Sequence, residues 1–245
     1  TMIWAIYLYE KGKEKQSAIL LAVSIATKFF PLVLLFPIFI SCFREKRIKN
    51  FFSYFGYTIG AWLVINLPFM LINFRGWSYF YEFSYKRAIG SASIWDVTSR
   101  LSLPLPNNKI TFYILNLAVV VILGLYLLKS RTPVPLVESS FLIMFAFILF
   151  NKQYSMQYVI WLAALAVLAI SKLNKQHQLS IVYLYALWQA SELAFQFSFF
   201  QNILTGMNPE TTSPAISGTV YGVIGTARYL IAIVFTVVLA KFLYD

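Results

Sequence analysis

The stretch Gln16–Phe43, QSAILLAVSIATKFFPLVLLFPIFISCF, decides how this chain is built. It is apolar apart from an interruption near its middle, where Lys28 and Pro31 stand. Basic residues flank it on both sides: Lys11, Lys13 and Lys15 before it, and Arg44, Lys46, Arg47 and Lys49 after it. Positive flanks mark the cytoplasmic side of a membrane, so both ends are expected on that side. The stretch therefore predicts two half-spans folded into a hairpin, with Lys28 at the far tip.

The predicted arms are too short to cross a bilayer. Each has about 12 residues, which as helix is about 18 Å, against a hydrocarbon core of about 30 Å. The tip is therefore expected in the outer half of the membrane. An ammonium group held there, towards the lipid phosphates, suggests a lipid-phosphate site at Lys28. The alternative is a lysine that simply extends to the interface.

Composition places the whole chain in a membrane. Of its 245 residues, 60% are hydrophobic and 12% charged, and mean hydropathy is +0.71. Soluble domains have about twice that charged fraction. Twelve of the twenty Lys and Arg residues fall in short loops and a tail that we assign to the cytoplasm, so the net charge of +11 does not call for a nucleic-acid partner. A single cysteine excludes an internal disulfide, and a single histidine disfavours a His-rich metal site.

Hydropathy and loop charge together predict an all-α, polytopic transmembrane helix bundle of about 8–9 spans, the hairpin included. The expected spans are 1–9 (partial), 17–42 (the hairpin), 51–72, 110–128, 134–150, 157–171, 179–199 and 218–240. Segments 73–109, 151–156 and 201–218 are expected outside, with 73–109 lying along the interface. Residues 1–245 are read as one integral membrane domain. Because the first residues resemble the end of a helix, we expect the C-terminal part of a longer scaffold.

Two charged residues are expected inside spans. Arg228 lies in GTARYLIAIVF, and Glu192 lies in LWQASELAFQF between Gln189 and Gln196. An Arg in a membrane segment costs about 2.5–3.5 kcal/mol on insertion scales, so it usually faces a polar cavity or a charged partner. The alternative for Arg228 is again extension to the interface. The DxD, HExxH, CxxC, GxGxxG and GxSxG patterns do not occur, which removes the common metal, nucleotide and serine-hydrolase interpretations.

The most specific motif is Phe150–Trp161, FNKQYSMQYVIW. It resembles the FNK-x-x-[ST]-x-QY-x-x-W turn of polyprenyl-phosphate-mannose-dependent mannosyltransferases, a group of GT-C class membrane glycosyltransferases that includes the GPI mannosyltransferases. That group also has a Lys followed by Pro in a broken apolar hairpin, which Lys28 and Pro31 match. A weaker match is the outer loop YKRAIGSASIW, with Tyr85, Arg87, Ser93 and Trp95.

The resemblance implies a GT-C-like fold and transfer of a sugar, mannose, at the outer or lumenal face. The donor would be a polyprenyl-phosphate (dolichol-phosphate) sugar, the acceptor a lipid or glycan, and membrane lipids the other partners. The implied donor-phosphate and substrate residues are Lys28, Arg87, Lys152, Gln157, Tyr158 and Arg228. The catalytic carboxylate is expected upstream of Thr1. No metal ligand is implied, and the need for a divalent cation is left open.

Three alternatives stand beside this interpretation. The chain could be a lipid-linked saccharide transporter or flippase, which also needs cations inside the membrane, or a non-catalytic fragment. The turn at Lys152 could be purely structural, with Tyr158 and Trp161 anchoring the span at the interface and Gln157 capping or bridging it.

Overall fold

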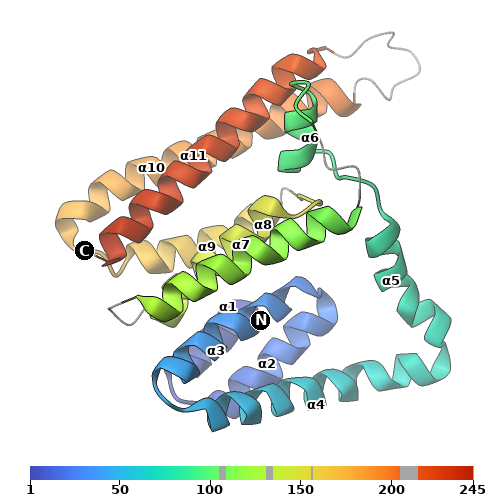
Figure 1. Ribbon diagram of the computed structural model, residues 1–245, viewed down its shortest axis with the longest axis vertical. Coiled ribbons are helices and arrows are strands. Elements are labelled where there is room, and N and C mark those ends of the chain that lie inside the picture. The colour runs from blue at the N-terminus through green and yellow to red at the C-terminus, as the bar shows by residue number, and fades with distance from the viewer. Residues whose placement is uncertain (105–108, 131–134, 156, 205–214, 245) are drawn as a thin grey trace. The chain divides into compact units, whose positions relative to one another are not determined.

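The computed structural model describes residues 1–104, 109–130, 135–155, 157–204 and 215–244 (Figure 1). All regular elements in these ranges are helices, which confirms the prediction of an all-α membrane bundle. Their bounds are α1 (Met2–Glu10), α2 (Glu14–Thr27), η1 (Phe30–Leu34), α3 (Leu35–Arg44), α4 (Ile48–Ile72), α5 (Phe74–Lys86), α6 (Ile94–Ser99), α7 (Lys109–Lys129), α8 (Leu136–Phe150), α9 (Tyr158–Ile170), α10 (Lys175–Phe199), η2 (Phe200–Leu204) and α11 (Gly218–Tyr244).

Contacts divide the chain into two compact units. The first comprises Thr1–Ala88 with Ile122–Met144, and the second comprises Ile89–Val121 with Phe145–Asp245. Each unit is described by itself below. The expectation that they form one integral membrane domain stays a prediction.

In the first unit the broken hairpin is present. Helix α2 ends at Thr27, Lys28 is extended (φ −157°, ψ 125°), and Pro31 lies in the first turn of the 3-10 helix η1. Proline lacks the amide hydrogen that a continuing helix would need, which explains the break. The two ends of the hairpin meet, because Arg47, just after α3, is 2.9 Å from the Glu14 carboxylate at the start of α2. The predicted return of the chain is therefore confirmed.

Small and hydroxylated side chains let α1 and α4 approach α2 closely. Ala18 and Ala22 on α2 are fully buried. The Ser17 hydroxyl donates to the Ala5 carbonyl at 2.6 Å and lies 2.9 Å from the Tyr54 hydroxyl. Such bonds between apolar helices are typical of membrane bundles, where every polar group needs a partner within the protein.

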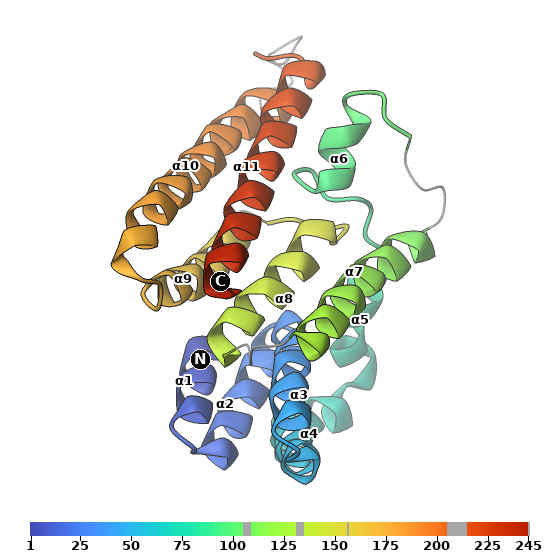
Figure 2. The same cartoon turned by 60° about the vertical axis from the view of Figure 1, so that its left-hand side comes forward.

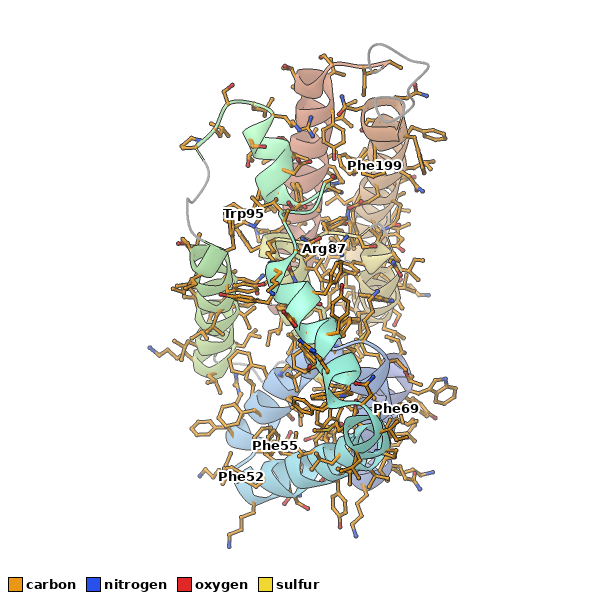
Figure 3. All side chains as sticks on the ribbon, turned by 90° about the vertical axis from the view of Figure 1, so that its right-hand side faces the viewer. Phe52, Phe55, Phe69, Arg87, Trp95 and Phe199 are labelled. Carbon is orange, nitrogen blue, oxygen red and sulfur yellow. The ribbon has the colours of Figure 1, made fainter. Side chains whose placement is uncertain are left out.

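Helix α4 is the most exposed long helix of this unit. Phe52, Phe55 and Phe69 lie along it at 65%, 40% and 61% exposure, and Figure 3 labels all three. The chain then turns into α5 at Asn73, whose side chain accepts a hydrogen bond from the Gly76 amide at 2.9 Å. The sequence indicated only an interfacial segment at 73–109, so helices α5 and α6 are additions to the prediction.

In the second unit α10 and α11 lie side by side, as Figures 1 and 2 both show. Trp188 of α10 stacks on Phe235 of α11 with ring centroids 5.3 Å apart, and both side chains are buried. Helix α6 packs on α11 at Gly225, where an added Cβ would stand only 2.4 Å from Val97 Cγ1. Glycine is therefore what allows α6 to sit against this helix.

Only some of the predicted spans are long and apolar enough to cross a membrane. Three described helices are long and apolar enough to cross a membrane: Ile48–Ile72, Ile110–Lys129 and Gly218–Leu243. Helices α8 and α9 lie within two residues of the expected bounds 134–150 and 157–171, but with 15 and 13 residues they are only about 22 and 20 Å long. Most of the expected outer connection 201–218 lies outside the described residues, as does Arg131.

Candidate active site

The turn between α8 and α9 carries the motif identified in the sequence. The Gln153 amide donates to the Asn151 side chain at 3.1 Å, and the Tyr158 amide donates to the Ser155 carbonyl at 2.8 Å. Lys152 is only 4% exposed, and its ammonium nitrogen lies 5.0 Å from the centroid of the Tyr113 ring. Lys152 therefore points into the second unit instead of extending to solvent.

The outer loop of the weaker match docks on this turn. The Gly90 amide donates to the Lys152 carbonyl at 2.9 Å, and the Trp95 indole donates to the Phe150 carbonyl at 3.0 Å. A Cβ added at Gly90 would stand 2.5 Å from the Gln153 side-chain oxygen, so only glycine allows this approach. The outer loop and the turn, which are far apart in sequence, thus lie in contact.

The loop is held at a strained residue. Ala92 has φ 96°, a conformation that is uncommon for residues with a side chain. Its carbonyl accepts two hydrogen bonds, from the Arg228 guanidinium and from the Tyr229 hydroxyl, both at 2.9 Å. Strain of this kind costs on the order of 1–3 kcal/mol and persists only where surrounding contacts impose it. Helix α11 supplies those contacts.

Arg228 has a charged partner on α10. Its guanidinium is 3.4 Å from the Glu192 carboxylate, which also accepts hydrogen bonds from the Tyr154 hydroxyl at 2.9 Å and the Trp188 indole at 3.1 Å. Arg228 is 1% exposed, so the alternative that it extends to the interface is wrong. The predicted interior position of Glu192 is confirmed.

Aromatic rings surround this ion pair and connect it to the motif. The Arg228 guanidinium carbon lies 4.0–4.4 Å from the centroids of the Phe195, Tyr229 and Tyr154 rings. Tyr154 meets Tyr158 edge-on at 6.1 Å, and Tyr158 in turn stacks on Trp161 at 4.8 Å. Rings in contact with a buried guanidinium stabilise its charge.

Gln157 and Tyr158 begin α9. Gln157 stands at the N-cap position and is exposed, but its side chain makes no capping hydrogen bond, so the suggestion that it caps the helix is wrong. Tyr158 is half-buried, with the ring contacts given above. A contact of either residue with substrate stays a prediction, as does contact of Lys152 or Arg228 with a donor phosphate.

Lys28 and Arg87 belong to the first unit. Lys28 is partly exposed at the hairpin tip, and the adjacent Phe29 ring meets Tyr81 of α5 edge-on at 5.6 Å. Arg87 is exposed at the C-terminal end of α5, where Figure 3 labels it, 5.9 Å from the Phe83 ring. Their convergence with Lys152 and Arg228 on one pocket stays a prediction.

Asp96 is the acidic residue closest to the docked loop in sequence. Its carboxylate accepts a hydrogen bond from the Ala92 amide at 3.3 Å and is 3.5 Å from the Arg100 guanidinium. Burial raises the pKa of Asp96, and Arg100 and Tyr221 oppose that effect. Within the described ranges, no three His, Cys, Asp or Glu side chains gather as metal ligands would. Participation of a divalent cation stays a prediction.

Comparison with known families supplies the identity of the chain. The sequence model of glycosyltransferase family 87 matches residues 1–150, well over half of the 245. The chain belongs to glycosyltransferase family 87. No curated protein and no solved structure matches it. The matched region covers the hairpin and the docked loop, and it ends at Phe150, where the FNK turn begins.

Family 87 membership and the apolar helices make this protein a membrane glycosyltransferase. The closer resemblance to GPI mannosyltransferases stays a prediction. The sequence analysis of this family 87 enzyme missed the pairing of Glu192 with Arg228 and the roles of Tyr154 and Ala92. Opposite charges within two apolar helices were a signal for pairing Glu192 with Arg228. The strained conformation of Ala92 has no signal in the sequence.

Proposed function

We propose that this family 87 protein transfers mannose from a polyprenyl-phosphate donor to a lipid or glycan acceptor at the outer or lumenal face of a membrane. Family membership supports glycosyl transfer. The observation that carries the choice of donor is the contact of the two motif segments through the Gly90 amide and the Lys152 carbonyl. Both segments resemble enzymes that use such a donor, and their contact favours one shared site.

The reaction requires a base and a stabilised leaving group. A carboxylate takes the proton of the acceptor hydroxyl while its oxygen bonds to C1 of the sugar. The bond from C1 to the phosphate oxygen breaks, and polyprenyl phosphate leaves with an additional negative charge. Cations fixed near that phosphate stabilise the transition state more than the ground state.

In this proposal Lys152, Lys28 and Arg87 contact the donor phosphate, Lys as a point charge and Arg with two parallel bonds. Gln157 and Tyr158, at the start of α9, contact the sugar or orient the outer loop. Arg228 is also proposed to contact the donor phosphate. Its second role, which is to hold Ala92 in place, is supported by its 2.9 Å hydrogen bond to the Ala92 carbonyl and by its burial.

The test uses the full-length protein, purified in lipid nanodiscs. Polyprenyl-phosphate mannose, polyprenyl-phosphate glucose and GDP-mannose are supplied in separate reactions, and product is measured by mass spectrometry. We expect transfer only from polyprenyl-phosphate mannose. Transfer only from the nucleotide sugar would refute the proposed donor, and transfer of glucose but not mannose would refute the sugar.

Lys152→Ala tests the role of the turn. The loss of one charge-assisted hydrogen bond, about 1.5–3 kcal/mol, should reduce transfer about tenfold or more, with expression and membrane insertion unchanged. Arg75→Ala is the control, because Arg75 is an exposed cation on α5 and should tolerate the change. Full activity of Lys152→Ala would favour the anchoring interpretation of the motif.

A further inference from the structure

The hairpin brings basic loops that are distant in sequence to one end of the first unit. The loop after α1 and the loop after α3 are joined by the Arg47–Glu14 ion pair at 2.9 Å. A third segment joins them, because the Arg44 guanidinium donates to the carbonyls of Leu127 and Ser130, at the end of α7, at 2.6 and 2.8 Å. The exposed lysines of these three segments are Lys11, Lys13, Lys15, Lys46, Lys49 and Lys129. We call this set the lysine rim.

Two of the nearby carboxylates, Glu14 and Glu45, are engaged by arginine. Arg47 bonds to both Glu14 and Glu45. Glu14 also receives a hydrogen bond from the Asn50 side chain at 3.5 Å. Arginine therefore holds the loops together, and the lysines carry the excess positive charge on the surface.

Aromatic side chains indicate the depth at which the lysine rim lies in the membrane. The Lys11 ammonium lies 5.6 Å from the Tyr7 ring centroid, and the Lys15 ammonium lies 5.4 Å from that of Tyr57. Trp4, on the same helix as Tyr7, is 63% exposed. Tyr and Trp concentrate at the level of lipid headgroups, so the lysines above these rings are placed beside headgroup phosphates. Binding of a nucleic acid would not require aromatic side chains at the level of the lipid headgroups.

The backbone at Lys46 adds an independent observation. Lys46 has φ 58° and occupies, in the turn after α3, the left-handed position that Gly12 (φ 72°) occupies in the turn after α1. In both turns the next amide bonds to the carbonyl five residues earlier, at 2.9 and 2.8 Å. Glycine adopts this conformation without strain and is the usual residue there. A lysine stands at a position where the backbone conformation favours glycine.

We infer that the lysine rim is a binding site for anionic phospholipid headgroups. The recognised chemistry is a phosphate monoanion or diester at the membrane surface. The site is distinct from the proposed donor site, because the rim and Lys28 are at opposite ends of α2, about 21 Å apart along its axis. The inference that the lysine rim binds lipid rests on none of the donor-site assignments.

The test measures lipid binding by the full-length protein in detergent micelles. Phosphatidylglycerol, phosphatidylcholine and inorganic phosphate are titrated separately, and bound lipid is counted by native mass spectrometry. We expect saturable binding of phosphatidylglycerol at least tenfold tighter than of the other two probes. Equal binding of phosphatidylcholine or of inorganic phosphate would overturn the inference.

Two variants and a control test whether the lipid binds at the lysine rim. A basic residue near an anionic surface contributes about 1 kcal/mol, so the triple variant Lys13→Gln, Lys46→Gln and Lys49→Gln should weaken binding on the order of a hundredfold. The control Lys172→Gln with Lys175→Gln removes exposed lysines between α9 and α10 and should leave binding unchanged. An equal loss in the control would show diffuse attraction and overturn the inference.

The single variant Lys46→Gly separates binding from folding. Because glycine relieves the strained turn, the melting temperature should stay the same or rise. Lipid affinity should nevertheless fall about fivefold, the effect of one lysine. Unchanged lipid affinity in this variant would overturn the inference even if the triple variant fails to fold.

Discussion

The buried pair of Glu192 and Arg228 gives the sharpest prediction about the second unit. In the variant Glu192→Gln the amide oxygen can still accept the hydrogen bonds from Tyr154 and Trp188, both of which reach the same oxygen of Glu192. Only the negative charge is lost, and the guanidinium 3.4 Å away remains buried. Removing one partner of a buried pair costs about 3–5 kcal/mol, so we expect a loss of that size in the free energy of unfolding.

The loss is measured by equilibrium unfolding in mixed micelles, followed by circular dichroism. The control Glu82→Gln removes an exposed carboxylate, paired with Lys86 on α5, and should leave the unfolding free energy unchanged. The double variant Glu192→Gln with Arg228→Met removes both charges. It should be more stable than the sum of the two single losses predicts, by at least about 1.5 kcal/mol.

Glu192→Gln and the double variant should also make the outer loop more mobile. Without a fixed guanidinium, the Ala92 carbonyl keeps only the Tyr229 hydroxyl as donor. A cysteine placed at Ser91, with Cys42 replaced by alanine, should then react faster with a water-soluble maleimide. A loss below about 1 kcal/mol in Glu192→Gln, together with additive single effects and an unchanged labelling rate, would refute the proposed clamp.

Three further predictions concern packing, pH and topology. Gly225→Ala should destabilise the protein by about 1–3 kcal/mol through the clash with Val97, whereas Gly60→Ala, with open space around its added Cβ, should be tolerated; thermal melting distinguishes them. Since burial raises the pKa of Asp96, the folded state binds the proton more tightly, and wild-type stability should fall as pH rises from the ordinary carboxyl pKa through the raised value. Asp96→Asn should remove this fall in stability. If hydrogen exchange in α6 had the same pH dependence in Asp96→Asn as in the wild type, the assignment of the fall to Asp96 would be wrong. Lys28→Cys should label from the outer side while the two basic loops stay protected; labelling of those loops from opposite faces would contradict the hairpin.

The sequence predicted the helical architecture well because its signals are local. Apolar length and loop charge place most helices within a few residues of their observed bounds, and Pro31 explains the break at the hairpin tip. The same signals place the ends of α8 and α9 within two residues, because the polar residues between Phe150 and Tyr158 interrupt the apolar run.

The candidate site was predicted in parts, as separate residues. Lys152 and the outer loop were both identified, but their contact depends on long-range packing that one sequence does not reveal. Arg228 was identified by its charge, while Ala92, the residue it holds, has an unremarkable side chain. What matters at Ala92 is a backbone angle, which is set by its neighbours in space and leaves no trace in its identity.

The short helices α8 and α9 require an explanation within a membrane bundle. At about 22 and 20 Å they fall roughly 8–10 Å short of the hydrocarbon thickness of an average bilayer. Helix α8 is buried along almost its whole length, so protein, and not lipid, surrounds this short helix. Because a helix enclosed by protein does not need to match the bilayer thickness, the polar turn that holds Lys152 can end α8 early without exposing its backbone to acyl chains.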